Sequence, residues 1–157
     1  MPGTIKGILL NTGKQFLSEL LAGKHDNNSF GMYIEYCNST PTAPALLATR
    51  DLSYYTGLTG NYGFVRVPFV TTAALGATQY TTMFSGIVLP DCATSGATLG
   101  SSSKFYSATL VYIADKAVGS KDVPIFVRNF YAGDTFSPVT NAANTNFTAT
   151  INLALGE

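Results

Sequence analysis

Three glycines spaced three residues apart, Gly57, Gly60 and Gly63, are the first feature of the sequence that could do chemistry. They lie in YYTGLTGNYGFVRVPF (54–69), and a glycine-rich loop can cradle a phosphate where it opens a helix. A P-loop also needs Lys followed by Ser or Thr, which this stretch lacks. The residues after Gly63 instead alternate with the period of a strand. We therefore interpret the glycines as residues that allow positive φ in a turn before a strand.

His25 is the one histidine in the chain and hence the first candidate for a proton carrier near neutral pH. It follows the segment expected to be helical, outside any G-x-S-x-G nucleophile motif, so we expect a solvated turn residue. The acidic residues are scattered, and Cys37 and Cys92 match no metal-ligand spacing. Both thiols are expected to be reduced and buried, with a disulfide left open. The sequence therefore predicts a protein that is not an enzyme, with no catalytic, cofactor-binding or metal-binding residues.

Tyr54, Tyr55 and Tyr62 cluster around the glycine corner. Tyrosines on loops can stack on sugars or anchor a protein interface, but their hydroxyls also commonly lie at the rim of a core. A carbohydrate-binding jelly-roll module therefore remains open. Arg66, like Arg50 and Arg128, can form a salt bridge to a partner or to the protein's own surface.

One helix must help to position these groups, and it is signalled in NTGKQFLSELLAGK (11–24). Thr12 and Gln15 have the spacing of a capping box, and Gly23 is placed to end the helix. The helix carries one apolar stripe, made of Phe16, Leu17, Leu20 and Leu21. A helix of about ten residues is too short to be stable alone in water, so the stripe must dock on the domain or on a neighbouring subunit. Phe16 and Leu20 are accordingly candidate interface residues.

The rest of the chain reads as short strands separated by turns. Alternating or β-branched segments occur at 30–36, 80–89, 105–115, 123–131 and 147–155. Such a series predicts a mainly β fold, an antiparallel β-sandwich of jelly-roll type with one short N-terminal amphipathic helix. We expect a single domain over 1–157, with an N-terminal arm and helix at 1–29 and the β-sandwich at 30–157.

Three long connections separate these strands, at 37–51, 91–104 and 132–146. Connections of about fifteen residues are usually functional or disordered, and these carry too little charge for disordered tails. We expect them to become ordered on contact with neighbouring subunits. The segment 123–131 is apolar on both faces, which predicts cover from the second sheet and from a partner.

The composition favours a partner-bound subunit as strongly as an ordinary low-charge β protein. Charged residues make up 11% of the chain, and nine basic residues balance nine acidic ones. This balance provides no field to attract nucleic acid or an anionic membrane, and neither is expected as a partner. We find no secretory signal and no apolar run near the roughly 18 residues of a membrane span.

The order of the segments is also informative. A short helix after LNTG is followed by a strand ending in NSTPTAP, the corner TGLTGNYGFVRVPF, SATLVYIAD, AGDTFSP and an alternating last strand. This order resembles a loose group of small tailed-bacteriophage virion proteins, described as head decoration, cement or fibre-associated proteins. At the corner the chain has Tyr62, Gly63, Phe64 and Arg66, with Val65 before the arginine, and Gly133, Asp134 and Thr135 form the late turn.

The resemblance implies a structural subunit of the virion that is assembled in the host cytoplasm. Its most concrete form is a capsid decoration or cement protein whose partners are the major capsid protein and copies of itself, with a trimer as one homo-oligomer. The interface would include Phe16, Leu20, Tyr54, Tyr55, Tyr62 and Arg66. A tail, collar or fibre-associated component is the alternative, and a carbohydrate-binding jelly-roll module is the second.

Overall fold

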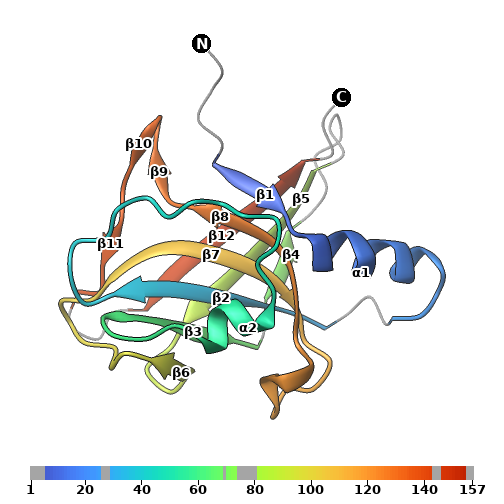
Figure 1. Ribbon diagram of the computed structural model, residues 1–157, viewed down its shortest axis with the longest axis horizontal. Helices are drawn as coiled ribbons and strands as arrows, with labels where there is room; N and C mark the ends of the chain where they lie inside the picture. The colour runs from blue at the N-terminus through green and yellow to red at the C-terminus, as the bar shows by residue number, and fades with distance from the viewer. Residues whose placement is uncertain (1–5, 26–28, 69, 74–80, 143–145, 155–157) are drawn as a thin grey trace.

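The computed structural model describes residues 6–25, 29–68, 70–73, 81–142 and 146–154, which form a mainly β structure of antiparallel sheets (Figure 1). The large sheet has the strand order β1-β8-β7-β2-β3-β6, with β11 added beside β7. Its strands are β1 (Gly7–Leu9), β2 (Phe30–Cys37), β3 (Tyr62–Val67), β6 (Ala93–Gly96), β7 (Lys104–Tyr112), β8 (Val123–Asn129) and β11 (Val139–Thr140). The small sheet consists of β12 (Phe147–Ala154), β5 (Thr81–Val88) and β4 (Thr71–Ala73). The predicted antiparallel β-sandwich is thus confirmed.

The main core lies between the two sheets. Met32 and Ile34 of β2 are fully buried and belong to the same cluster as Leu110 of β7, Phe84 of β5 and Ile151 of β12. Alternation places these side chains on the inner face of each strand, as the sequence pattern predicts. In Figure 1 the strands β5 and β12 lie on the far side of the large sheet.

The opposite face of the large sheet is covered by the chain itself. Residues 38–51 cross this face as an irregular segment, and the short helix α2 (Leu52–Thr56) follows on the near side in Figure 1. A second core forms beneath them, from Tyr33, Tyr55, Phe64, Val111 and Ile113. Residues 38–51 are therefore ordered on their own sheet, and contact of the predicted loop 37–51 with a neighbouring subunit stays a prediction. The prediction of a single helix missed α2.

The predicted N-terminal helix is α1 (Asn11–Leu21), which packs against β8. Phe16 is 2% exposed, and a Cβ added at Gly13 would lie 2.2 Å from the backbone oxygen of Ile125, so only glycine permits this approach. Leu17 and Leu20 are half-buried against the main core, but Leu21 is 91% exposed. The predicted stripe is therefore correct except at Leu21, and α1 docks on its own domain.

The start of α1 differs from the predicted capping box. Leu10 occupies the N-cap position and makes no side-chain cap. The Thr12 hydroxyl instead donates to the Pro124 carbonyl at 2.6 Å, and Gln15 donates to Glu19 at 2.9 Å. Thr12 thus fastens the helix to β8. Residues 7–9, which the sequence assigned to an arm, form the sheet strand β1.

Two of the predicted long loops contain further strands. Residues 91–104 include β6, which pairs with β3. Residues 132–146 include β11, and the hairpin of β9 (Tyr131–Ala132) and β10 (Thr135–Phe136) turns at Gly133 with φ of 59°. A single 3₁₀ turn, η1 (Gly119–Lys121), precedes β8.

The glycine corner is a turn before a strand, as expected, but the three glycines differ. Gly60 has a φ of 67°, whereas Gly57 ends α2 at φ of −87°. Gly63 lies inside β3, where a Cβ would be 2.6 Å from the Ser95 carbonyl oxygen. Only Gly60 therefore needs the left-handed conformation that the sequence suggested for all three.

Candidate functional site

The predicted aromatic cluster is divided between core and surface. Asp51 caps α2 by accepting hydrogen bonds from the backbone N–H groups of Ser53 and Tyr54. Tyr55 is 0% exposed, and its hydroxyl lies 2.7 Å from that of Thr109. Its assignment to an interface is therefore wrong, because it is a core residue. Tyr62 remains 40% exposed.

A buried carboxylate lies beneath α2. Glu35 of β2 is 0% exposed, and its Oε2 is 3.3 Å from Nη1 of Arg50. The hydroxyls of Tyr54 and Tyr106 donate to its Oε1 at 3.1 and 3.2 Å. The Arg50 guanidinium also donates to the Ala45 carbonyl at 2.8 Å and lies 4.2 Å from the centre of the Tyr54 ring. We call these four side chains, Glu35, Arg50, Tyr54 and Tyr106, the Glu35 cluster.

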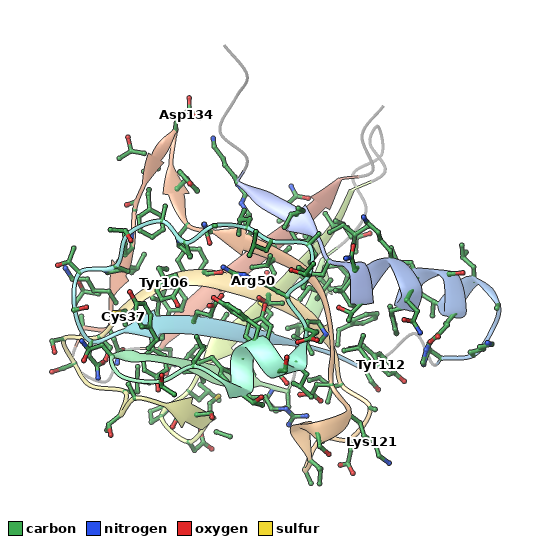
Figure 2. The ribbon with its side chains drawn as sticks, in the orientation of Figure 1. Cys37, Arg50, Tyr106, Tyr112, Lys121 and Asp134 are labelled. Atoms are coloured by element: carbon green, nitrogen blue, oxygen red, sulfur yellow. The ribbon has the colours of Figure 1, made fainter. Side chains whose placement is uncertain are left out.

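The Glu35 cluster attaches the irregular segment to the sheet. Figure 2 shows Arg50 and Tyr106 close together over the large sheet, and both bind Glu35. A buried charge is tolerated only when it is paired and hydrogen-bonded, and here the partner comes from the loop. Burial, followed by the nearby charge of Glu35, raises the pKa of Tyr54 and of Tyr106 above its ordinary value. Both hydroxyls therefore remain neutral donors.

A second ion pair lies at the other end of the same face of the large sheet. Arg66 Nε and Nη2 bind the two Asp122 oxygens at 2.6 and 2.8 Å, and Tyr33 donates to the same carboxylate. The guanidinium also donates to the carbonyls of Asp115 and Lys116. The Asp122 hydrogen bonds raise the pKa of Arg66. Arg66, predicted as an interface residue, therefore holds η1 and its flanking turns on β3.

His25 is not the solvated residue that the sequence suggests. Its Nε2 lies 2.7 Å from Glu19 Oε2, and its ring stacks on Phe16 at 4.9 Å between centroids. Tyr112 packs on the same histidine, with 5.1 Å between the ring centroids. His25 thus links the C-terminal end of α1 to the large sheet through its contacts with Glu19 and Tyr112.

The described part of the chain contains no group of three or more His, Cys, Asp or Glu residues that could hold a metal ion. Within those same residues, no helix is long and apolar enough to span a bilayer. Cys37 is buried and Cys92 half-buried, and both are free thiols. The carboxylates of Glu35 and Asp122 are buried and ion-paired within the chain.

One exposed surface lies on the small sheet, which the sequence analysis did not single out. Met83 and Ile87 of β5 point outward and are 36% and 47% exposed. Thr148, Thr150 and Asn152 of β12 lie on the same outer face. The strands β4, β5 and β12 contain no charged residue. We call this surface the neutral face.

A groove of about 710 Å³ adjoins the neutral face where the two sheets separate. Its apolar lining includes Val67, Pro68, Val70, Ile87 and Leu89, and Leu89 is 43% exposed. A signal for this surface was present in the sequence. In 80–89, Met83 and Ile87 alternate with Phe84 and Val88, so both faces of the strand are apolar.

Comparisons with known proteins identify no relative of this chain: no protein-family model matches it, and no curated protein or solved structure matches it significantly.

Proposed function

We propose that the protein is a non-enzymatic structural protein of a bacteriophage virion, a capsid decoration or cement protein that bridges major capsid subunits. The observation that carries this proposal is the neutral face, an exposed and partly apolar surface whose strands contain no charged residue. The groove beside it is lined mainly by apolar residues, and its lining also includes Arg66, Asp91 and Lys116. In this function the protein acts as a homo-oligomer on the capsid after assembly in the host cytoplasm.

The chemistry of the neutral face suits permanent attachment. Removing Met83, Ile87 and Leu89 from water is favourable, and the Thr and Asn side chains can form hydrogen bonds at little desolvation cost. Contacts of this kind are scarcely screened by salt, unlike ion pairs. Several copies on one shell would also add their modest contacts through multivalency.

The buried ion pairs support the same function indirectly. Arg50 and Arg66 are both satisfied within the chain, so neither is available to steer a charged partner. Binding through the neutral face therefore uses apolar and uncharged polar groups, and it depends on shape and burial more than on charge.

A binding experiment with matched variants tests the proposal. Ile87→Asp places a charge on the neutral face, whereas Val118→Asp places one at an equally exposed position, since both residues are 47% exposed. We expect Ile87→Asp to weaken binding to purified phage shells at least tenfold and Val118→Asp to leave it within twofold. Wild-type binding should persist at about half-molar salt. Equal losses in both variants, or release by salt, would contradict the proposal.

Location within the particle separates the structural alternatives. Density for the protein on the shell lattice in a virion reconstruction supports the decoration function, and density at the tail, collar or fibres supports the alternative. The tyrosine cluster gives little support to the carbohydrate-binding alternative, because Tyr55 is buried and Tyr54 binds Glu35. Specific retention of the protein on a glycan resin would favour it.

A further inference from the structure

The strand β12 forms a long free edge of the small sheet. It pairs with β5 along all eight residues, from Phe147 opposite Val88 to Ala154 opposite Thr81, with no shift of register. Within the described residues it pairs with no other strand. In an antiparallel ladder, alternate residues direct their N–H and C=O groups away from the neighbour, so β12 offers a row of such groups on its free side.

This edge lacks the protection that sheet edges normally carry. Monomeric proteins keep edge strands short, or place charges, proline or a bulge in them. The other edge strands follow this rule, since β1 and β4 have three residues each and β6 has four. In contrast, β12 (FTATINLA) has eight residues without a charge, a proline or a bulge. Such an edge favours pairing with another strand.

Open space borders the same edge. Thr150 and Ile151 of β12 line an opening of about 240 Å³ together with Arg128 and Phe130. The end of β8 and the start of the β9–β10 hairpin therefore leave open space beside the middle of β12, at Thr150 and Ile151.

We propose that β12 pairs antiparallel with β12 of a second copy, about a two-fold axis at Thr150. The two small sheets, of three strands each, then form one continuous sheet across the dimer. This inference rests on the homo-oligomer of the proposed function and specifies the surface that forms it.

The register follows from the alternation of the strand. Residues opposite one another must lie on the same face, and an axis at Thr150 satisfies this condition along the strand. On the inner face, Ala149 then lies opposite Ile151 of the second copy, and Phe147 lies opposite Leu153. On the outer face Thr150 meets its own counterpart, and Thr–Thr pairs across strands are favourable.

The same alternation explains why the occupant is a second copy. Each inner pair joins two apolar side chains, and the outer Thr148 and Asn152 pair as polar groups without charge. No like charges meet at any position, so the strand is complementary to itself and forms the isologous interface of a closed dimer.

A disulfide-trapping experiment tests the register. The Thr150→Cys variant is made with Cys92→Ser, which removes the half-buried native thiol, while Cys37 is buried. Directly opposite residues in a sheet have Cα atoms about 4.5–5.5 Å apart, within the range of a disulfide. We expect more than half of Thr150→Cys to form a covalent dimer on mild oxidation. Ser85→Cys, on the neighbouring strand of the same face, should form less than a tenth as much.

Two further measurements make the outcome decisive. Sedimentation should show a dimer for the wild type and a monomer for Thr150→Lys, which sets two like charges opposite each other, while Ser85→Lys stays dimeric. A monomeric or trimeric wild type, or equal crosslinking at both cysteines, overturns the inference. If such a protein still binds phage shells, the proposed function survives without this dimer. If the dimer forms but shells are not bound, the proposed function fails and the strand pairing stands.

Discussion

The two faces of the large sheet are both buried, yet they are built from different chemistry. Ile34 and Glu35 are neighbours on β2 and both are 0% exposed. Ile34 points into the main core between the sheets, whereas Glu35 points to the face covered by residues 38–51 and α2. One face is packed by hydrocarbon and the other is organised by two buried ion pairs, those of Glu35 with Arg50 and Asp122 with Arg66.

The difference shows that the two faces of one sheet can be covered through different interactions. Hydrophobic burial has no direction, so the apolar face accepts any well-packed partner of suitable shape. Hydrogen-bonded ion pairs have direction, so the Glu35 cluster dictates the path of an irregular segment that has no strand pairing of its own. The hydrogen bonds of the polar face thus fix one conformation for residues 38–51, which their own sequence does not specify.

The polar face is also the less completely satisfied of the two. Three buried side-chain atoms in the described residues have no hydrogen-bond partner, namely Arg50 Nε, Ser107 Oγ and Asn129 Oδ1. Arg50 and Asn129 bind the consecutive carbonyls of Ala45 and Pro44, and Ser107 lies opposite Asn129 in the sheet. A partly satisfied polar network costs free energy. Changes of pH and substitutions should therefore destabilise the protein more when they act on the polar face than when they act on the apolar face.

Alkaline pH should have the largest effect, because it acts on the polar face as a whole. Burial is the main cause that raises the pKa of Tyr33, Tyr54, Tyr55 and Tyr106 on this face, and that of Tyr36 on the apolar face. Unfolded tyrosines ionise near pH 10, so the stabilisation is complete below pH 10 and is lost as pH rises toward the higher folded values. We expect unfolding above pH 10, with circular dichroism and tyrosinate absorbance changing together. Ionisation of these tyrosines in a native spectrum would contradict this account.

Glu35→Ala should be the most damaging single substitution of the comparison. It leaves the Arg50 guanidinium buried and unpaired, and breaking a buried ion pair costs roughly 3–5 kcal/mol. Urea denaturation measures the loss, and proteolysis should cut residues 38–51 faster than in the wild type. The double variant Glu35→Ala with Arg50→Met should recover at least half of the lost stability. A double variant no better than the single one would show that the ion pair is not the cause.

Tyr55→Phe sharpens the comparison by deleting one hydroxyl from the polar face. The change leaves the buried Thr109 hydroxyl without its 2.7 Å partner, which costs roughly 1–3 kcal/mol. Thr109→Val in the same background replaces that hydroxyl with a methyl group, and we expect it to restore part of the loss. A neutral Tyr55→Phe in urea denaturation would mean that this hydrogen bond contributes nothing.

Ile34→Val should have the smallest effect, since the apolar face loses one methylene and no partner. Such changes cost roughly 0.5–1.5 kcal/mol. Proteolysis of residues 38–51 should remain at the wild-type rate, because Ile34 faces away from them. Release of this segment by Ile34→Val would erase the distinction between the faces.

The strands were predictable because alternation is a local property. β2, β5, β7, β8 and β12 all fall within the segments chosen from the sequence, apart from one or two terminal residues. β6 was missed because ATSG has little strand propensity, and it forms only by pairing with β3. Thr12 illustrates the same limit, since its hydroxyl bonds Pro124, which is 112 residues away.

The polar face could not be predicted for a related reason. In FGMYIEY, Glu35 occupies an alternate position that normally faces solvent. Its partner Arg50 lies in an irregular segment whose path is determined only in the folded protein. Tyr55 was assigned to an interface because sequence cannot distinguish a buried from an exposed aromatic residue in a short turn.

The close backbone approaches at Gly13 and Gly63 provide a sequence pattern by which distant relatives can be recognised. A Cβ at residue 13 would lie 2.2 Å from a backbone oxygen of Ile125, and one at residue 63 would lie 2.6 Å from that of Ser95. Backbone cannot move aside as a flexible side chain can, so every descendant of this fold must retain glycine at both places or shift an entire element. We therefore expect Gly13 and Gly63 to be retained in relatives whose surface residues have diverged beyond detectable similarity. A profile weighted on these two positions and the strand pattern between them should therefore recover lineages that overall identity no longer reveals.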